Sequence, residues 1–301
     1  MRVAALDLGS NTSLLLVADV ADGVIERILH DETHVTRMGQ GVQASRRFHP
    51  DALARMDKCL RDYRATIERL NCYKTVAVAT SAARDVENSE ELMRLGRTHS
   101  IPIHIIPGVK EAELTFRGAL CDRIRNAGIA VVDVGGGSTE VIADAEGGPE
   151  GVSIDIGSVR LTEKFISRHP VPQGDRRQME AHVKQAFAKV ALPRRRDLQE
   201  VVAVAGTPTT LAALDQEREF DEKHVHGCKL SLARIEYWTE RLAAMTIEER
   251  ERLPGMQPER ADVIVAGAVV LAGAIQALGH AEVTVSTRGV RYGVALAWQE
   301  F

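Results

Sequence analysis

The chain has 301 residues, a net charge of −4 at neutral pH and a sequence pI of about 6.2. This length allows two domains of ordinary size, each with its own core. The slightly acidic balance argues against a nucleic-acid or anionic-membrane partner. A polyanionic substrate would therefore have to meet a local cluster of Arg and Lys side chains.

The cysteines lie far apart and show no C-x-x-C spacing, which favours reduced thiols over a disulfide framework or a zinc site. They are Cys59, Cys72, Cys121 and Cys228. The chain opens with no secretion signal, and its most apolar stretch, 263–275, is too short and too rich in glycine and alanine to favour lipid over a protein core. These features predict a cytoplasmic protein.

The first 36 residues predict three consecutive strands, at 3–8, 12–19 and about 24–36, arranged as an antiparallel meander. The first strand carries Asp7 near its end and runs into a small polar turn, Gly9-Ser-Asn-Thr12. An amphipathic helix follows over 51–70, with apolar residues every three or four positions.

A short buried strand at 75–79 is followed by Thr80-Ser-Ala-Ala-Arg84 at its carboxyl end, where ligand contacts gather in α/β sheets. Arg84 is thus either a phosphate clamp or a surface arginine at the start of the helix after Asn88. Another strand is predicted at 101–106.

A helix is predicted from Val109 to about Ile124, and its first turn contains Lys110, Glu111 and Glu113. Acidic residues in a first turn usually complement the helix dipole. From position alone, Glu111 is therefore either such a complement or a catalytic carboxylate.

The stretch 129–142 reads as a buried strand, an acidic residue, three glycines and a second strand. Gly135, Gly136 and Gly137 allow main-chain N–H groups to converge on an anion, and Ser138 and Thr139 add hydroxyl groups. Asp133 stands where a divalent cation would neutralise phosphate charge. The alternative is a plain glycine-rich turn between two core strands.

The same order of parts occurs near the N-terminus, because Asp7 and Asp133 each follow an apolar run and precede a glycine turn and another strand. A duplicated unit at domain-sized separation predicts two similar lobes that face one phosphate site.

The second half predicts a turn at 147–149, a strand at 152–156 and a helix opening at Gly157, whose N-terminus is a further candidate for phosphate. Gly206 and Thr207 follow a strand at 201–205 and form another anion-cradle candidate. Further helices are predicted at 178–190, 231–243, 258–278 and 290–298, with a strand at 282–286. His224, His226 and Cys228 have the look of metal ligands, but without a second cluster a polar loop is favoured. The basic run 194–196 could touch a polyanion, although such runs are usually solvated loops.

Each half therefore resembles a ribonuclease H-like lobe of the duplicated fold found in the actin, hexokinase and heat-shock ATPase superfamily. A narrower resemblance, to the exopolyphosphatase/guanosine pentaphosphate phosphohydrolase family, covers essentially the whole chain through five motifs in order. They are Asp7-Leu-Gly-Ser-Asn-Thr12, Thr80-Ser-Ala-Ala-Arg84, Ile106-Pro-Gly-Val-Lys-Glu-Ala112, Asp133-Val-Gly-Gly-Gly-Ser-Thr-Glu140 and Ala205-Gly-Thr207.

The resemblance implies a catalytic pair, Glu111 and Glu140, and metal ligands Asp7, Asp133 and Glu140 for Mg²⁺ or Mn²⁺. It implies phosphate contacts from Ser10, Asn11, Thr12, Arg84, Gly136, Gly137, Ser138, Thr139, Gly206 and Thr207. Phosphoanhydride cleavage needs a positioned water, a carboxylate to orient or deprotonate it, and positive charge on the transferred phosphoryl group.

Lys110 departs from the family pattern, since many members carry a second acid there; it would either tune Glu111 or contact phosphate. The expected lobes are 1–124 and 125–301, with a helix at about 290–301 packed back on the first lobe and the active site in the cleft. The chain matches the short form of the family, without a C-terminal HD-type domain, which predicts a preference for short chains.

The leading function is release of terminal orthophosphate from inorganic polyphosphate. The alternatives are a guanosine pentaphosphate phosphohydrolase, a non-catalytic alarmone or polyphosphate sensor, and an ATP-dependent kinase of the same fold. No nucleic-acid or membrane partner is expected, and a homodimer is left open.

Overall fold

The computed structural model describes residues 1–123, 128–145, 148–193 and 198–301. The chain divides into two compact units. The first comprises Met1–Arg123 and Arg288–Phe301, and the second is Ile124–Thr287. The C-terminal residues therefore belong to the same unit as the N-terminus.

The first unit contains a sheet with strand order β3-β2-β1-β4-β5, in which β1 to β3 form the predicted antiparallel meander and β4 and β5 add in parallel. Its strands are Arg2–Leu8 (β1), Thr12–Ala21 (β2), Val24–Val35 (β3), Lys74–Ala79 (β4) and Ile103–Ile105 (β5). Its helices are Val42–Ser45 (α1), Pro50–Arg69 (α2), Ser81–Asp85 (α3), Ser89–Thr98 (α4), Gly108–Ala119 (α5) and Val290–Leu296 (α13), followed by the 3₁₀ turn Trp298–Glu300 (η2).

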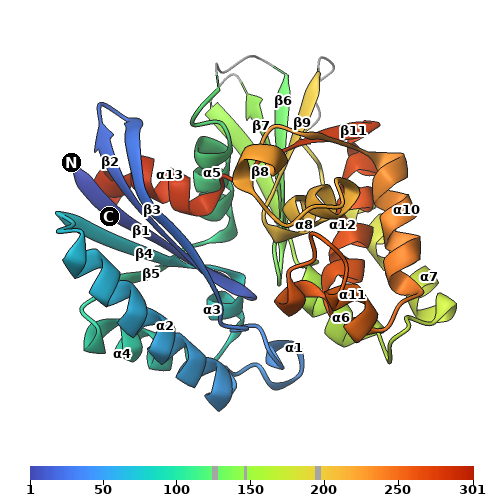
Figure 1. Ribbon diagram of the computed structural model, residues 1–301, viewed down its shortest axis with the longest axis horizontal. Helices are drawn as coiled ribbons and strands as arrows, with labels where there is room; N and C mark the ends of the chain where they lie inside the picture. The colour runs from blue at the N-terminus through green and yellow to red at the C-terminus, as the bar shows by residue number, and fades with distance from the viewer. Residues whose placement is uncertain (124–127, 146–147, 194–197) are drawn as a thin grey trace. The chain divides into compact units, whose positions relative to one another are not determined.

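Alternate residues of β1 enter two separate cores, because successive side chains of a strand point to opposite faces. Ala4 and Leu6 join the core that contains α2 and α4, whereas Val3 and Ala5 join the core that contains α5 and α13. The sheet thus lies between two helical layers (Figure 1). Asp7 continues the second series, so its side chain lies on the α5 and α13 face.

Helices α5 and α13 cross where both carry glycine. A Cβ atom on Gly118 would lie 2.0 Å from the carbonyl oxygen of Gly289, and one on Gly293 would lie 1.9 Å from that of Leu114. Only glycine permits such close backbone approach. This crossing fixes α5, and with it Glu111, on the sheet of the first unit.

The second unit contains a sheet with strand order β10-β11-β9-β6-β7-β8. Its strands are Ile129–Val134 (β6), Thr139–Ala145 (β7), Gly148–Ile154 (β8), Glu200–Val204 (β9), Lys229–Ser231 (β10) and Glu282–Val285 (β11). Its helices are Ser158–Phe165 (α6), Gln173–Ala188 (α7), Gly206–Asp215 (α8), Glu222–Val225 (α9), Leu232–Ala243 (α10), Ile247–Glu251 (α11) and Ile264–Leu278 (α12), with the 3₁₀ turn Pro258–Arg260 (η1).

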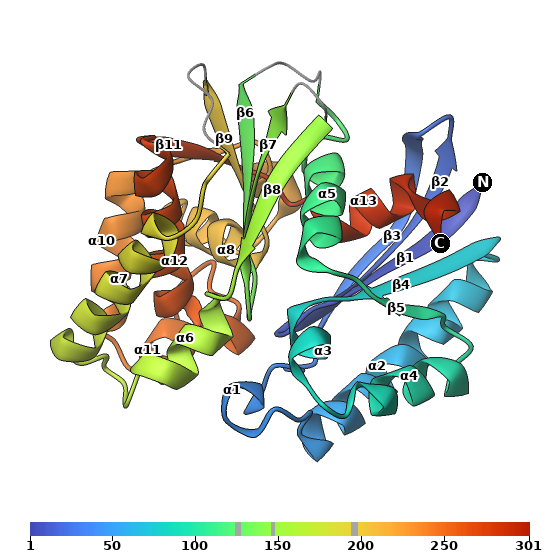
Figure 2. The same ribbon diagram turned by 180° about the vertical axis from the view of Figure 1, so that it is seen from behind.

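One face of this sheet packs against a helical layer built around α12. Val132 and Val134 of β6 and Val141 of β7 join a core with residues of α7, α10 and α12, and Figure 2 shows these helices beside the sheet. Asp133 and Glu140 alternate with those valines, so both carboxylates lie on the opposite face.

The two sheets repeat one topology. The order β3-β2-β1-β4-β5 of the first unit corresponds to β8-β7-β6-β9-β11 of the second, with an antiparallel meander followed by parallel strands in each case. The predicted duplication of a ribonuclease H-like fold is therefore confirmed.

Three predicted elements differ from the structure. A turn was predicted at 147–149, but Pro149 lies in β8, opposite Asp144. A proline is tolerated at this position because β8 is an edge strand of the sheet. Gly147 lies outside the described residues, as do Arg194, Arg195 and Arg196.

The helix predicted at 258–278 is divided, because η1 ends at Arg260 and α12 begins at Ile264. The carbonyl oxygen of Ala261 accepts a hydrogen bond from the side chain of Arg250 instead of from a helical N–H group. The helix predicted from Val109 also ends early, at Ala119.

In the described residues, no helix combines the length and apolar character needed to cross a bilayer. The four cysteines are free thiols.

Candidate functional site

The turn between β1 and β2 presents its N–H groups and ties down its carbonyl groups. The N–H of Gly9 donates to the carbonyl oxygen of Thr12 at 3.0 Å. The carbonyl oxygens of Ser10 and Asn11 accept from main-chain N–H groups of the segment 36–39, at 2.7 to 3.1 Å. In the part of the chain that the structure describes, no hydrogen bond is recorded for the N–H groups of Ser10 and Asn11, which suits them to an anion.

The side chains of this turn are buried. The Oγ atoms of Ser10 and Ser81 lie 2.9 Å apart, which joins the turn to the start of α3. Asn11 is 7% exposed, and its Nδ2 has no hydrogen-bond partner among the described residues. A buried amide without a partner is costly, so Asn11 is a further donor suited to a ligand.

The turn between β6 and β7 is built in the same way. The N–H of Gly135 donates to the carbonyl oxygen of Ser138 at 3.0 Å. The carbonyl oxygens of Gly135 and Gly136 accept from the first three N–H groups of α6 at 2.9 to 3.0 Å. Over the described ranges, the N–H groups of Gly136, Gly137 and Ser138 have no recorded hydrogen bond. Both predicted phosphate turns therefore share one donor arrangement.

Helix α6 supports this turn from behind. Arg160 donates from Nε to the carbonyl oxygen of Gly137 at 2.7 Å, and a Cβ atom on Gly157 would lie only 2.5 Å from the backbone of Gly136. The expectation that the N-terminus of α6 itself binds phosphate is corrected, because its N–H groups are already bonded to the glycine turn.

Thr139 also differs from its expected role. Its hydroxyl donates to the carbonyl oxygen of Ile156 at 2.6 Å, and the residue is fully buried. The hydroxyl thus fastens β7 to the segment before α6 instead of presenting its proton to phosphate. Ser138 is 2% exposed and remains a candidate.

Asp133 and Glu140 lie directly opposite each other on β6 and β7. Cross-strand neighbours have Cβ atoms about 4.5–5.5 Å apart, and like charges there are destabilising unless a cation neutralises them. Both residues are buried, and Glu140 accepts a 2.6 Å hydrogen bond from the hydroxyl of Ser153 on β8. Sequence reasoning missed Ser153, although strand pairing places it opposite Glu140.

The described residues contain no group of three or more His, Cys, Asp or Glu side chains arranged to hold a metal ion. The pair of Asp133 and Glu140 nevertheless fits Mg²⁺, which usually takes one or two carboxylates and completes its shell with water and substrate phosphate. The metal assignment of Asp7 stays a prediction. Burial lowers the pKa of Arg291, but the charge and hydrogen bond of Asp31, with a smaller contribution from Asp7, hold it above its ordinary value.

In the first unit, Arg84 and Glu111 form an ion pair. Nη1 of Arg84 lies 2.7 Å from Oε2 of Glu111 and also donates to the carbonyl oxygen of Ile106 at 2.9 Å. The Glu111 side chain is 9% exposed and that of Arg84 is 22% exposed. The first turn of α5 therefore directs Glu111 to an arginine inside the protein.

Burial raises the pKa of Glu111, and this outweighs the lowering caused by the charge and hydrogen bond of Arg84 and by a hydrogen bond from Thr80. A carboxylate whose pKa is raised toward neutrality is a better proton acceptor. Dipole complementation at a helix terminus does not require such a buried carboxylate with a raised pKa.

Lys110 points to other partners. Its Nζ binds Glu113 at 2.9 Å and also pairs with Glu300, and Arg117 bridges the same two carboxylates at 2.7 and 2.6 Å. Lys110 thus belongs to a charge network that joins α5 to η2, and the expected phosphate contact has no support.

The N-terminus of α8 contains Gly206 and Thr207. Thr207 is buried, and a Cβ atom on Gly267 of α12 would lie 2.3 Å from its Oγ1, so this hydroxyl is packed against α12. Ala205 has φ = 76°, which is strained for a residue with a side chain. The first N–H groups of the helix remain the donors suited to phosphate.

Sequence reasoning missed Arg260, whose guanidinium occupies the space beside Gly206: a Cβ atom on that glycine would lie 1.2 Å from Nη1. Burial lowers the pKa of Arg260 to about 10, so the group stays protonated at neutral pH. A guanidinium beside the positive end of a helix is favourable when an anion is shared between them. The sequence pattern predicts Arg260 within a continuous helix, and nothing in that pattern indicates that its guanidinium lies beside Gly206.

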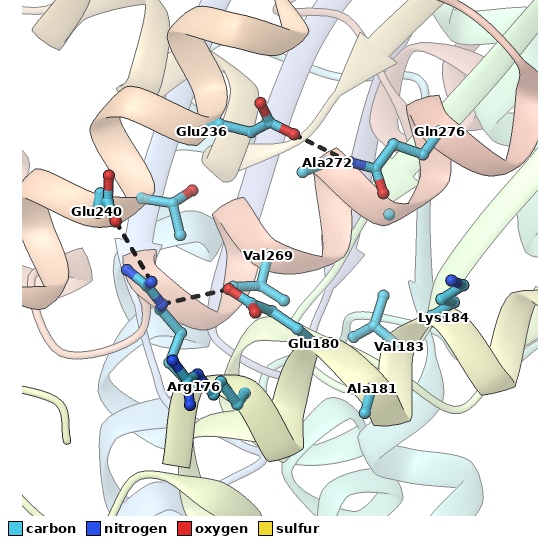
Figure 3. A pocket seen from close by; sticks show the side chains of 13 residues that line it. Arg176, Glu180, Ala181, Val183, Lys184, Glu236, Glu240, Val269, Ala272 and Gln276 are labelled. Carbon is cyan, nitrogen blue, oxygen red and sulfur yellow. Dashed lines mark hydrogen bonds and ion pairs between the residues drawn. The ribbon is translucent and has the colours of Figure 1, made fainter. Parts of the chain in front are cut away.

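A groove of about 480 Å³ lies elsewhere in the second unit, between α7 and α10 over α12 (Figure 3). Within it, Arg176 pairs with Glu180 at 3.3 Å and with Glu240 at 3.4 Å. Gln276 donates to Glu236 at 3.0 Å. The groove shares no residue with the predicted phosphate motifs, and its carboxylates do not suit a polyanion.

His226 and Thr287 interact through Nδ1 and Oγ1 at 3.1 Å, between the end of α9 and the segment after β11. The polar-loop interpretation holds for residues 226–228, whereas His224 lies within α9.

The Ppx/GppA phosphatase family model matches residues 16–300. The chain is 37% identical to exopolyphosphatase 2 of Mycobacterium tuberculosis over 316 aligned residues, which cover 98% of each protein. A solved exopolyphosphatase-like protein aligns with a TM-score of 0.89 at 30% identity, covering 99% of this chain and 97% of that one. The PPX-GPPA enzyme of Aquifex aeolicus aligns with a TM-score of 0.81 at 29% identity, covering 99% of both.

The chain therefore belongs to the Ppx/GppA phosphatase family, as the five motifs indicated. Members of this family generally use divalent metal ions.

Proposed function

We propose that this chain is an exopolyphosphatase, which releases the terminal orthophosphate of inorganic polyphosphate. The observation that carries the proposal is Glu111, a buried carboxylate with a raised pKa that is held 2.7 Å from Arg84. Family membership and the 37% identity to an exopolyphosphatase support it. A non-catalytic sensor would not need a carboxylate tuned to accept a proton.

In this proposal, Glu111 takes a proton from the attacking water, and Arg84 keeps the carboxylate oriented and adds positive charge for the transferred phosphoryl group. The N–H groups of the two turns, at 10–11 and 136–138, position phosphate oxygens. Variants in either turn should impair the release of phosphate.

Asp133 and Glu140, together with Asp7, are the proposed ligands of Mg²⁺ or Mn²⁺. The bound cation would neutralise charge that develops on the phosphate oxygens. Glu140 is already fixed by Ser153, so this carboxylate needs little reorganisation to bind an ion. We also place the protein in the cytoplasm, where its free thiols would stay reduced.

The test is to incubate the purified protein and Mg²⁺ separately with polyphosphate, with guanosine pentaphosphate, and with ATP plus sugars, and to measure orthophosphate and phosphorylated sugar. Phosphate release that is fastest from polyphosphate supports the proposal. Faster release from guanosine pentaphosphate would favour the nucleotide hydrolase, and sugar phosphorylation would favour a kinase. Binding without turnover would indicate a sensor.

A further inference from the structure

Arg250 is the largest fully buried side chain in the described residues, with an exposed fraction of 0%. Its Nε donates to the carbonyl oxygen of Leu242 at 2.7 Å, and its Nη1 donates to that of Ala261 at 2.8 Å. Nη2 has no hydrogen-bond partner among the residues that the structure describes. Burying a guanidinium in this way is expensive, and apolar replacements of buried charges are often neutral or stabilising. Core packing alone therefore does not explain an arginine here.

The two carbonyl groups that Arg250 holds belong to separate segments. Leu242 lies in the last turn of α10, whereas Ala261 immediately follows Arg260 and precedes α12. One planar side chain thus joins the end of a helix to the segment 258–263, where the predicted long helix is interrupted.

Arg260 is fixed from both sides of this segment. Arg250 holds the backbone at Ala261, and the Nε of Arg260 donates to the side-chain oxygen of Gln257 at 2.6 Å. The backbone N–H of Arg260 also donates to the carbonyl oxygen of Gln257 at 2.9 Å. These contacts leave the guanidinium of Arg260 beside Gly206, at the first turn of α8.

We propose that Arg250 is a positioning residue that holds Arg260 against the N-terminus of α8, so that the guanidinium and the helix N–H groups together bind a phosphate group of the substrate. This inference depends on the proposed function in one respect, because the proposed function identifies the bound anion as a phosphate group. Arg250 itself does not touch the substrate. A lysine at this position has one nitrogen and cannot reach two divergent carbonyl oxygens with fixed geometry.

The test is a double-mutant cycle with Arg250→Met, Arg260→Met and the double variant, each in a Glu111→Gln background that slows turnover during the measurement. Calorimetry measures the Kd of tripolyphosphate. We expect each single variant to weaken binding by about tenfold or more, the scale of a lost hydrogen bond to a charged group. In the Arg260→Met background, Arg250→Met should have no further effect on the Kd, because the residue through which it acts is gone.

Leu242→Ala is the matched control for loss of stability in the same helix end. It removes buried packing but keeps the carbonyl group that Arg250 binds, so it should lower the melting temperature without changing the Kd. Arg250→Lys should lie between the wild-type residue and Arg250→Met. If Arg250→Met does not fold by circular dichroism, Arg250→Lys replaces it in the cycle.

Additive effects of the Arg250 and Arg260 substitutions on the Kd would overturn the proposal, and so would an unchanged Kd in a folded Arg250 variant. Absence of binding to both tripolyphosphate and inorganic phosphate in the starting protein would overturn it as well. Turnover of polyphosphate by the unmodified chain is measured separately. A protein that binds tripolyphosphate but releases no phosphate would refute the exopolyphosphatase function while the cycle still tests Arg250.

Discussion

Arg84 and Glu111 are 27 residues apart in the sequence, and their side chains meet at 2.7 Å between α3 and α5. The family resemblance implied a separate role for each residue, Arg84 as a phosphate contact and Glu111 as a catalytic carboxylate. Their contact couples the two roles, because the charge of Arg84 partly offsets the effect of burial on the pKa of Glu111. Removing either side chain will therefore change the chemistry of the other.

Replacing Glu111 with glutamine should reduce the turnover of polyphosphate by about 10²-fold or more, the usual scale for loss of an acid–base group. The amide keeps the size of the side chain but cannot accept a proton. Steady-state phosphate release measures kcat, and calorimetry should show nearly unchanged substrate affinity. Glu113→Gln is the matched control, since Glu113 lies on the same helix but binds Lys110 and Arg117. Equal losses in both variants would contradict the assignment.

The pH profile of kcat should fall on the acid side through a pKa above 4.5, the ordinary value for glutamate. Activity needs ionised Glu111, so it is lost as the pH drops through the raised pKa. Arg84→Gln removes a charge that lowers this pKa, and the acid limb should move to higher pH. A limb that stays in place, or moves to lower pH, would show that another group controls it.

The free energy of unfolding should depend on the same ionisation of Glu111, but it should fall over the pH range in which kcat rises. Because the pKa of Glu111 is raised in the folded state, folding becomes less favourable as the pH rises above 4.5 and levels off beyond the folded-state pKa. Urea titrations at several pH values measure the free energy of unfolding. Between pH 4.5 and the folded-state pKa of Glu111, the value for Glu111→Gln should rise relative to that of the unmodified protein. A constant difference between the two proteins would mean that the pKa is not raised.

Activity should require a divalent cation, and Asp133→Asn or Glu140→Gln should raise the half-saturating concentration of Mg²⁺ by about tenfold or more, because each removes a negatively charged oxygen ligand. Glu150→Gln provides the control, since Glu150 is an exposed carboxylate on β8 of the same sheet. Metal titrations of phosphate release make the measurement. Full activity in excess chelator would refute this role.

Gly157→Ala should lower kcat/KM by about 10²-fold, the scale associated with a displacement of about 1 Å in a positioned group. The new methyl group would lie 2.5 Å from the backbone of Gly136 and push the phosphate turn away from α6. Gly174→Ala is the control, because nothing lies within 4 Å of its Cβ position. Similar kinetics for Gly157→Ala and the unmodified protein would show that the turn does not depend on this support.

The sequence by itself determined the two hairpins and their order. Apolar runs at 3–6 and 129–132 have to be buried strands, and the glycines after them permit turns that expose N–H groups. Those signals are local, so they identified the duplicated fold, the family and most of the candidate residues. The hydroxyl of Thr139 and the first N–H groups of α6 bond to residues 17 or more positions away, and local signals do not reveal such contacts.

Only the tertiary structure decided which side chains meet. The pairing of Arg84 with Glu111 depends on the packing of α3 and α5, and the capture of Lys110 by Glu300 depends on a contact across 190 residues. Arg260 reaches Gly206 because Arg250 holds the segment beside it, a relationship that no periodicity records. Hydrophobic patterns specify which face of an element is buried, but ion pairs and close backbone approaches depend on how those faces are brought together.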